Sequence, residues 1–458
     1  MPLSSTKDGA IRHGLGKIRF AWNVASIVDL DSLDRGTALT LLPTQSFIPM
    51  KCSLFLPAAL SLCALTSALA TDWRQWRGPH RDGHIGEEAR WPGTLDSLKQ
   101  VWHVELQPSY SGPLVVGNTI ITTSSRDKSF EGVKALDRAT GKEKWSVEWE
   151  AYQKVPFFAA SNGDWIRATP VSDGSHVYVA GMRDVLVCLE LATGKEVWRV
   201  DFVKELKADP PTFGFVCSPL LEGNFIYVQA GGAFCKLRKD TGELVWKSLA
   251  DGGGMNGSAF SSPILAELGG VQQLVVQTRS KLCGVNPQDG AELWGQKIKT
   301  FQGMNILTPV VSANRIYTSA YGGKSQLFQL SKAENQLVVA EQWQHKAEAY
   351  MSTPVVIAGK IFLHLRNQRF TCLDMATGQQ HWVTEEKFGK YMSLVANGDT
   401  ILALDERGIL LLIKANPEKF ELLSQHKISE QETWAHLAIS GRELFIRELK
   451  GLTAWKWE

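Results

Sequence analysis

Short runs of alternating apolar and polar residues fill the chain from about residue 100 to its end. Four of them begin with Gly and then alternate: GNTIITT (117–123), GSHVYVA (174–180), GNFIYVQ (223–229) and GKIFLHL (359–365). Alternation places successive side chains on opposite faces of a strand, and a leading Gly suits the tight turn before it. Each run therefore predicts the second strand of a β-hairpin.

A second hairpin recurs with a shared Gly-x-x-x-Trp spacing. The copies are LDRATGKEKW (136–145), LELATGKEVW (189–198), LRKDTGELVW (237–246), VNPQDGAELW (285–294) and LDMATGQQHW (373–382). In the first copy, Asp137 can accept backbone N–H bonds in an Asx-type turn and Gly141 can supply the positive φ that such a turn needs. Two hairpins per unit predict a four-stranded antiparallel sheet, which is the blade of a β-propeller.

Two markers each occur eight times and alternate along the chain. The outer-strand positions are Trp102, Trp145, Trp198, Trp246, Trp294, Trp343, Trp382 and His426. The innermost strands are marked by Pro113, Pro170, Pro219, Pro263, Pro309 and Pro354, with Leu394 and Leu437 in the corresponding place. A period of 40 to 50 residues indicates propellers or related arrays. We therefore expect an all-β chain that forms an eight-bladed β-propeller of four-stranded antiparallel blades over residues 100–458.

The two ends of the repeat region are expected to complete one blade together. The last strand, LTAWKW (452–457), has no outer strand after it, while the segment around Trp102 precedes any complete blade. Sheets that are apolar on both faces are covered only when neighbours close a circle, and unpaired edges favour aggregation. We predict that the Trp102 segment pairs with 452–457 and closes the ring.

The N-terminal region carries an export signal. Residues 50–70 start with Met50 and Lys51, continue through an apolar run and end in Ala68-Leu69-Ala70, the order of a secretory signal peptide. The apolar run is shorter than the roughly 20 residues that a bilayer requires, so no transmembrane span is expected. We predict cleavage after Ala70 and a periplasmic or secreted protein. Residues 1–49 would be an unstructured upstream extension, with the start at Met1 or Met50 left open, and residues 71–99 would pack on the propeller.

Charge and cysteine content narrow the partners. The 458 residues are 44% hydrophobic and 21% charged, which excludes gross disorder. Without residues 1–70 the chain holds 43 basic and 43 acidic residues, so no nucleic-acid partner is implied. The five cysteines beyond Ala70 are scattered over different repeats, and we expect buried thiols and no zinc site. A monomer is expected.

These repeats resemble the pyrroloquinoline-quinone-like (PQQ-like) repeat family, whose members carry the L-D-x-x-T-G-x-x-x-W unit and form eight-bladed propellers of the quinoprotein alcohol dehydrogenase type. DWRQWRGPHRDG (72–83) also resembles the opening of many exported propellers of this family in planctomycete-type bacteria. The resemblance implies the fold far more specifically than the function, because propellers carry enzymes, scaffolds and binding modules alike.

Two functions are compatible with this resemblance. A quinoprotein dehydrogenase oxidising alcohols or sugars would hold PQQ over calcium, and such enzymes typically carry a Cys-Cys pair, which this sequence lacks. Calcium needs six to eight oxygen ligands, and no acidic or amide cluster recurs at equivalent blade positions. We therefore favour a non-catalytic scaffold in the cell envelope, similar to the outer-membrane assembly propeller lipoproteins of the family. No catalytic residue, metal ligand or cofactor is predicted for the scaffold. PQQ and calcium would be cofactors only if the protein were a quinoprotein dehydrogenase.

A candidate binding ring lies three residues before each innermost-strand marker. Such a ring could receive an envelope protein or peptide, or an apolar ligand, at one mouth of the central channel. The alternative is that these side chains only fill the space between blades, as side chains in propeller interiors usually do. The eight positions are Tyr110, Arg167, Val216, Phe260, Ile306, Met351, Tyr391 and Trp434.

Overall fold

The computed structural model describes residues 72–86, 91–151, 154–157, 159, 163–250, 259–334 and 336–458, which belong to one compact unit, Thr66–Glu458. The expected upstream extension (1–49) and signal peptide (50–70) lie outside the described residues. Among the described residues, no helix is both long and apolar enough to cross a membrane.

The described residues form eight four-stranded antiparallel sheets, and within seven of them the strands follow one another in sequence order. The first two blades are β2 (Leu114–Val116), β3 (Thr119–Arg126), β4 (Phe130–Asp137) and β5 (Glu143–Glu150), then β6 (Val171–Ser172), β7 (His176–Gly181), β8 (Val185–Glu190) and β9 (Glu196–Asp201). The third and fourth are β10 (Leu220–Glu222), β11 (Phe225–Ala230), β12 (Ala233–Arg238) and β13 (Leu244–Ser248), then β14 (Ile264–Leu268), β15 (Val271–Gln277), β16 (Lys281–Val285) and β17 (Glu292–Lys297). The fifth and sixth are β18 (Val310–Ser312), β19 (Arg315–Ser319), β20 (Ser325–Ala333) and β21 (Gln336–His345), then β22 (Val355–Ile357), β23 (Lys360–His364), β24 (Phe370–Asp374) and β25 (Gln380–Val383). The seventh is β26 (Met392–Asn397), β27 (Thr400–Asp405), β28 (Ile409–Lys414) and β29 (Glu421–Lys427). Blades are joined in two places by short helical turns whose bounds the structure describes, α1 (Phe202–Glu205) and a 3-10 turn (Phe301–Gly303).

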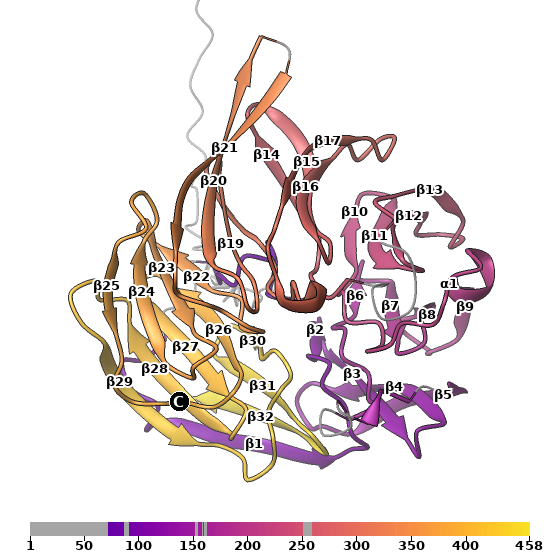
Figure 1. The fold of residues 1–458 in the computed structure, drawn as a ribbon. Helices are drawn as coiled ribbons and strands as arrows, with labels where there is room; N and C mark the ends of the chain where they lie inside the picture. Colours follow the sequence, from indigo (N-terminus) through magenta and orange to yellow (C-terminus); the bar gives the residue numbers. More distant parts are fainter. Residues whose placement is uncertain are drawn as a thin grey trace, which may run out of the picture. The chain divides into compact units, whose positions relative to one another are not determined.

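The eighth blade is built from both ends of the repeat region. Its strands are β30 (Ala438–Ser440), β31 (Glu443–Glu448), β32 (Gly451–Trp457) and β1 (Leu98–Glu105), in the order β1-β32-β31-β30. β1 pairs antiparallel with β32 from Leu98 opposite Trp457 to Glu105 opposite Gly451, and the two strands lie side by side in Figure 1. The innermost strands β30 and β2 are also in contact, so the first and eighth blades are neighbours. The predicted propeller, its eight blades and its closure are confirmed.

Tryptophans on most of the outer strands pack on a turn of the next blade. All eight predicted outer positions lie on an outermost strand. Trp102 of β1 packs on the Thr-Gly turn of the first blade, where a Cβ at Gly141 would lie 2.8 Å from the indole ring, and its Nε1 donates to the Arg138 carbonyl at 2.9 Å. The glycine is therefore needed for close approach as well as for its φ of 70°. The same indole bond recurs, at 2.9 to 3.0 Å, from Trp145 to Leu191, Trp198 to Lys239, Trp343 to Met375 and Trp382 to Asn416.

The fourth blade is fastened differently. The fifth blade has no Gly in the matching turn, because β20 runs to Ala333 and β21 begins at Gln336. Trp294 accordingly donates its Nε1 to the side-chain carbonyl of Gln273 within its own sheet, and the whole ring is buried. The docking of a Trp thus depends on the turn it would meet in the next blade.

Burial follows the position of a strand in its blade. The second and third strands are covered on both faces, as in β27, where Ile401, Leu402, Ala403 and Leu404 are all fully buried. The outermost strands alternate between exposed and half-buried residues, as in β13. This layering leaves the innermost strands and the segments before them as the lining of the channel.

Candidate functional site at the channel mouth

The eight predicted ring residues line one cavity. They come from the segments just before the innermost strands of all eight blades and enclose a volume of about 160 Å³. Tyr110 and Phe260 are buried and the other six are half-buried. The structure therefore brings the predicted set together at one end of the channel. Binding at this cavity remains a prediction.

Aromatic side chains form one wall of the cavity. The rings of Tyr391 and Trp434 stack with centroids 5.8 Å apart and planes 18° from parallel, and Tyr110 lies 5.7 Å from Trp434. Glu432 holds two of them in place, because its Oε2 accepts from the Tyr110 hydroxyl at 3.1 Å and from Trp434 Nε1 at 3.0 Å. Trp165, which is not a ring position, adds an edge-to-face contact 5.1 Å from Tyr110. Such arrangements give rigid apolar surface with fixed orientation.

Arg167 is the one charged residue among the described residues that line the cavity. Its guanidinium carbon lies 5.9 Å from the centroid of the Tyr110 ring, and Nη2 donates to the Gly163 carbonyl at 2.6 Å. Its Nε is shielded from solvent and has no hydrogen-bond partner among the described residues. Burial lowers the pKa of this guanidinium, although it stays charged at neutral pH.

The floor of the cavity is Trp76, from the segment that precedes the repeats. Its ring is flanked by two guanidinium groups, those of Arg77 and Arg81, each 5.6 Å from the ring centroid. Both arginines are buried, and burial lowers the pKa of each to about 10. Residues 72–86 therefore enter the channel and block it below the ring.

The two arginines are held by backbone carbonyls of distant blades. Arg77 donates to the carbonyls of Thr353 at 2.9 Å and Pro354 at 2.7 Å in the sixth blade. Arg81 donates to those of Ser218 at 2.9 Å and Pro219 at 2.8 Å in the third. A buried charge requires several such bonds, and these bonds fix the segment across the channel.

Backbone pairing anchors both ends of the same segment. Trp73 exchanges two backbone bonds with Val115 of β2, at 2.9 and 3.0 Å. At the other end, Ala396 of β26 donates to the Gly83 carbonyl at 2.7 Å and accepts from Ile85 at 3.0 Å. The segment thus forms single β-bridges with the first and seventh blades and contacts the third and sixth through its arginines.

A girdle of hydroxyls surrounds the channel just below the ring. In five of the blades, the residue before the innermost-strand Pro donates its backbone N–H to the hydroxyl of the equivalent residue in the next blade. The bonds run from Gly112 to Thr169, Thr169 to Ser218, Ser218 to Ser262, Ser262 to Thr308 and Thr308 to Thr353, at 3.0 to 3.3 Å. These hydroxyls therefore satisfy backbone N–H groups of the neighbouring blades.

His436 takes the girdle position of the eighth blade and packs against the segment. Its ring stacks on Trp73 at 6.4 Å and meets Trp76 edge-on at 6.0 Å, while Nδ1 donates to the Leu437 carbonyl at 2.9 Å. Burial lowers its pKa to about 3, so the imidazole is neutral. The contacts are structural.

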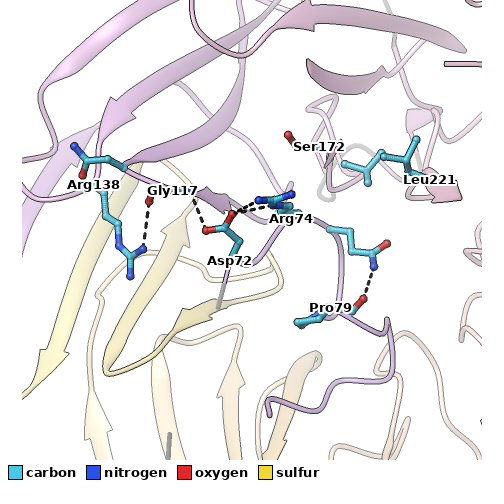
Figure 2. A pocket seen from close by; sticks show the side chains of 10 residues that line it. Asp72, Arg74, Pro79, Gly117, Arg138, Ser172 and Leu221 are labelled. Carbon is cyan, nitrogen blue, oxygen red and sulfur yellow. Dashed lines mark hydrogen bonds and ion pairs between the residues drawn. The ribbon is translucent and has the colours of Figure 1, made fainter. Parts of the chain in front are cut away.

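The other end of the channel has a different surface. β2 runs from Leu114 to Val116, so Tyr110 lies before its start and Gly117 after its end, and the two mark opposite ends of the channel. Around Gly117 a hollow of about 870 Å³ is lined by Asp72, Arg74 and Gln75 and by residues of the first three blades. Figure 2 shows the Asp72 carboxylate between Arg74 and the backbone N–H of Gly117, to which it bonds at 2.7 and 2.9 Å.

Other candidate chemistry is sparse in the described part of the chain. The five cysteines are buried thiols, as expected, and burial raises the pKa of Cys188, Cys217, Cys235 and Cys372 to about 12. No group of three or more His, Cys, Asp or Glu residues suited to a metal ion occurs among the described residues.

The repeat pattern predicts the eight ring residues, but it does not predict Trp76, Arg77 and Arg81 below them. Trp76, Arg77 and Arg81 stand in the resembling DWRQWRGPHRDG segment, yet nothing in the segment itself marks its arginines as buried, since Arg is mostly exposed in proteins. The one feature of the sequence that could have indicated a buried segment here is the high density of Trp and Arg outside the repeats.

Eight blades with Trp-to-turn docking define a β-propeller of the PQQ-like repeat class. The model of the family described as outer membrane protein assembly factor BamB matches residues 129–384, more than half of the chain, and the chain belongs to this family. It is 22% identical over 329 residues to the outer membrane protein assembly factor BamB of Yersinia pestis, covering 70% of this chain and 78% of that protein.

Two solved structures show the same fold. The BamB structure from Moraxella catarrhalis aligns with a TM-score of 0.58 at 15% identity, over 79% of this chain and 98% of that chain. The quinohemoprotein alcohol dehydrogenase from Comamonas testosteroni aligns with a TM-score of 0.61 at 12% identity, over 84% of this chain and 80% of that chain. At such identities the likeness extends to the fold alone.

Proposed function

We propose that this protein is an exported, non-catalytic scaffold of the cell envelope that binds a protein or peptide segment at the channel mouth. The observation that carries the proposal is the convergence of eight residues from eight blades on one rigid, half-open cavity. Trp, Tyr, Phe, Met and Arg are enriched at protein interfaces, and hot spots are typically Trp, Tyr and Arg. The relatives named as outer membrane assembly factors make an assembly role in the periplasm the natural setting.

The alternative, a quinoprotein dehydrogenase, fits the mouth poorly. The cavity of about 160 Å³ is small beside the roughly 300–1,000 Å³ of ligand pockets, and Trp76 with its two arginines fills the channel below it. The described lining residues include no carboxylate that could serve calcium. We therefore propose that neither PQQ nor calcium is held here.

A peptide selection would test the binding role. Random peptides would be selected on the immobilised chain starting at residue 71, and the best binders measured by calorimetry against wild type, Trp434→Ala and Leu423→Ala. Leu423 is an exposed apolar residue on the outer strand β29, so its variant controls for general loss of apolar surface. We expect Trp434→Ala to weaken binding about tenfold or more, as removal of a buried aromatic anchor does, and Leu423→Ala to leave it unchanged.

Thermal melting of the three proteins would separate lost binding from lost folding. Peptides that bind equally well to wild type and a folded Trp434→Ala variant would contradict the proposed site. Failure to select any peptide would contradict the role.

A further inference from the structure

We infer that the mouth cavity recognises the C-terminal residue of a peptide, with an aromatic side chain in the cavity and the free carboxylate at Arg167. The inference rests on the proposed function and adds the chemistry of the ligand. It follows from three features of the cavity: its size, its one charged wall residue and the charge beneath its floor.

The size of the cavity suits a single ring. A cavity of about 150 Å³ lined by apolar side chains binds benzene, and the mouth cavity has about 160 Å³. Its walls offer the stacked pair Tyr391 and Trp434 and the buried ring of Phe260. An aromatic side chain entering from solvent would find faces and edges at stacking distance.

Arg167 leaves donor capacity for a carboxylate. Nη2 is used by the Gly163 carbonyl, while Nε has no partner among the described residues although solvent does not reach it. A guanidinium has five N–H donors in a planar fork, and a carboxylate is the ligand that this fork matches. A carboxylate entering from solvent would bind the remaining N–H groups at the Nη end of the fork, and not the shielded Nε.

The charges beneath the floor of the cavity also favour an anionic ligand. Arg77 and Arg81 flank Trp76 and donate to backbone carbonyls, so their charges are solvated by dipoles and not cancelled by carboxylates in contact. Interactions between charges are screened little in such water-poor surroundings. The opposing charge of Glu432 contacts the hydroxyl end of Tyr110, whereas Arg167 faces the Tyr110 ring. The Asp164 carboxylate also acts on Arg167, but it pairs with Lys128 and accepts from the Val155 N–H.

A chain terminus fits the shape better than a passing segment. Residues 72–86 block the channel below the ring, so a peptide can enter the cavity but cannot thread through it. One residue fills the volume, and the last residue of a chain carries both a side chain and a carboxylate.

The test uses matched ligands and variants. A short Gly-Ser peptide ending in Phe would be titrated as the free acid and as the C-terminal amide, followed by tryptophan fluorescence and calorimetry. We expect wild type to bind the acid about tenfold more tightly than the amide, as one charge-assisted bidentate contact provides. Arg167→Gln should reduce this ratio to below about twofold, while the control Arg183→Gln, an exposed arginine of the same blade, should keep it.

Two further variants guard against a merely structural effect. Arg167→Lys keeps the charge without the fork and should retain part of the preference for the acid. Glu432→Gln removes the rim anion while keeping an acceptor for Tyr110 and Trp434, and should strengthen binding of the acid but not of the amide. Arg167→Gln should weaken binding of the acid and Glu432→Gln should strengthen it. Opposite effects on affinity from two substitutions at one site are not explained by damage to the fold.

The outcomes are distinct. Equal affinity for acid and amide in wild type would overturn this inference and leave the proposed peptide-binding role standing. No peptide binding in any form would overturn the proposed role itself. N-acetylphenylalanine that binds as tightly as the peptide acid would overturn the assignment to a chain terminus in favour of a small aromatic acid.

Discussion

The two ends of the channel differ in where their residues come from. The ring end is built from one position repeated in eight blades, and it is aromatic and half-open. The other end is covered by residues 72–86, which belong to no repeat, and its hollow is lined by charged and amide side chains such as Asp72, Arg74 and Gln75. Repetition thus supplies the candidate binding ring, and the single non-repeated segment 72–86 closes the cavity below it.

The largest effect is expected from removing the parts that do not repeat. A chain starting at Pro113 lacks both the floor segment, residues 72–86, and β1, so β32 keeps β31 but loses its outer partner and the eighth blade exposes an edge. We expect its melting temperature to fall by on the order of 10 °C or more relative to the chain starting at residue 71, measured by circular dichroism. A cooperative transition at an unchanged temperature would show that ring closure does not depend on β1.

Replacing one buried arginine should show how much the floor segment, residues 72–86, contributes to stability. Arg77→Ala removes bonds to the Thr353 and Pro354 carbonyls and leaves them unsatisfied, so we expect the free energy of unfolding to fall by about 3 kcal/mol in urea titrations. Arg74→Ala is the matched control, because Arg74 is half exposed and its ion pair with Asp72 lies at the surface. That change should cost less than about 1 kcal/mol. Equal effects of the two substitutions would mean that the floor segment is not fixed by Arg77.

Acid should weaken the floor through His436. Burial lowers the pKa of His436 to about 3 from 6.5, so between these values the unfolded chain binds the proton that the folded chain does not. The free energy of unfolding should therefore fall as the pH falls below about 6.5, by roughly 1 kcal/mol per pH unit for this group.

Other buried groups also titrate in this range, and His364 and Glu131 show the two possible directions. His364, with a pKa lowered to about 4 by burial, acts in the same direction. Glu131, with a pKa raised to about 7 by burial, acts in the opposite direction, because the folded chain then binds the proton between about pH 4.5 and 7. The slope for His436→Gln should be smaller than that of wild type in chemical denaturation at stepped pH. Identical slopes would show that His436 is not a neutral buried group.

The smallest effect concerns the girdle between the two ends. Ser218→Ala removes the hydroxyl that accepts from the Thr169 N–H, and we expect a loss of about 1 kcal/mol. Ser393→Ala is the control, since its hydroxyl is buried without a hydrogen-bond partner among the described residues. Its removal should change the free energy of unfolding by less than about 0.5 kcal/mol. A larger loss for Ser393→Ala than for Ser218→Ala would contradict the girdle.

The propeller and its eight binding-ring residues could be predicted from the sequence, whereas the buried segment below them could not, and the reason is physical. Gly141 and Trp102 each obey local rules of turn and strand chemistry, and eight such units leave closure as the way to cover apolar faces. The ring position could be found by alignment within the chain. Arg77 and Arg81 break the usual preference of Arg for solvent, and their partners are carbonyls, which any residue supplies. The different docking of Trp294 likewise depends on a turn in the next blade and not on its own repeat.

The floor segment also fixes the timing of folding. Residues 73–85 are synthesised before any blade, yet they pair with Ala396 and pack on His436, and β1 must wait for Gly451–Trp457. Contacts at such large sequence separation fold slowly, because most of the chain must be present before they can form. Residues 73–85 and β1 therefore cannot form all their native contacts until the last strand has been synthesised. Over that interval the chain exposes unpaired strand edges, and its yield should depend on chaperones wherever it folds.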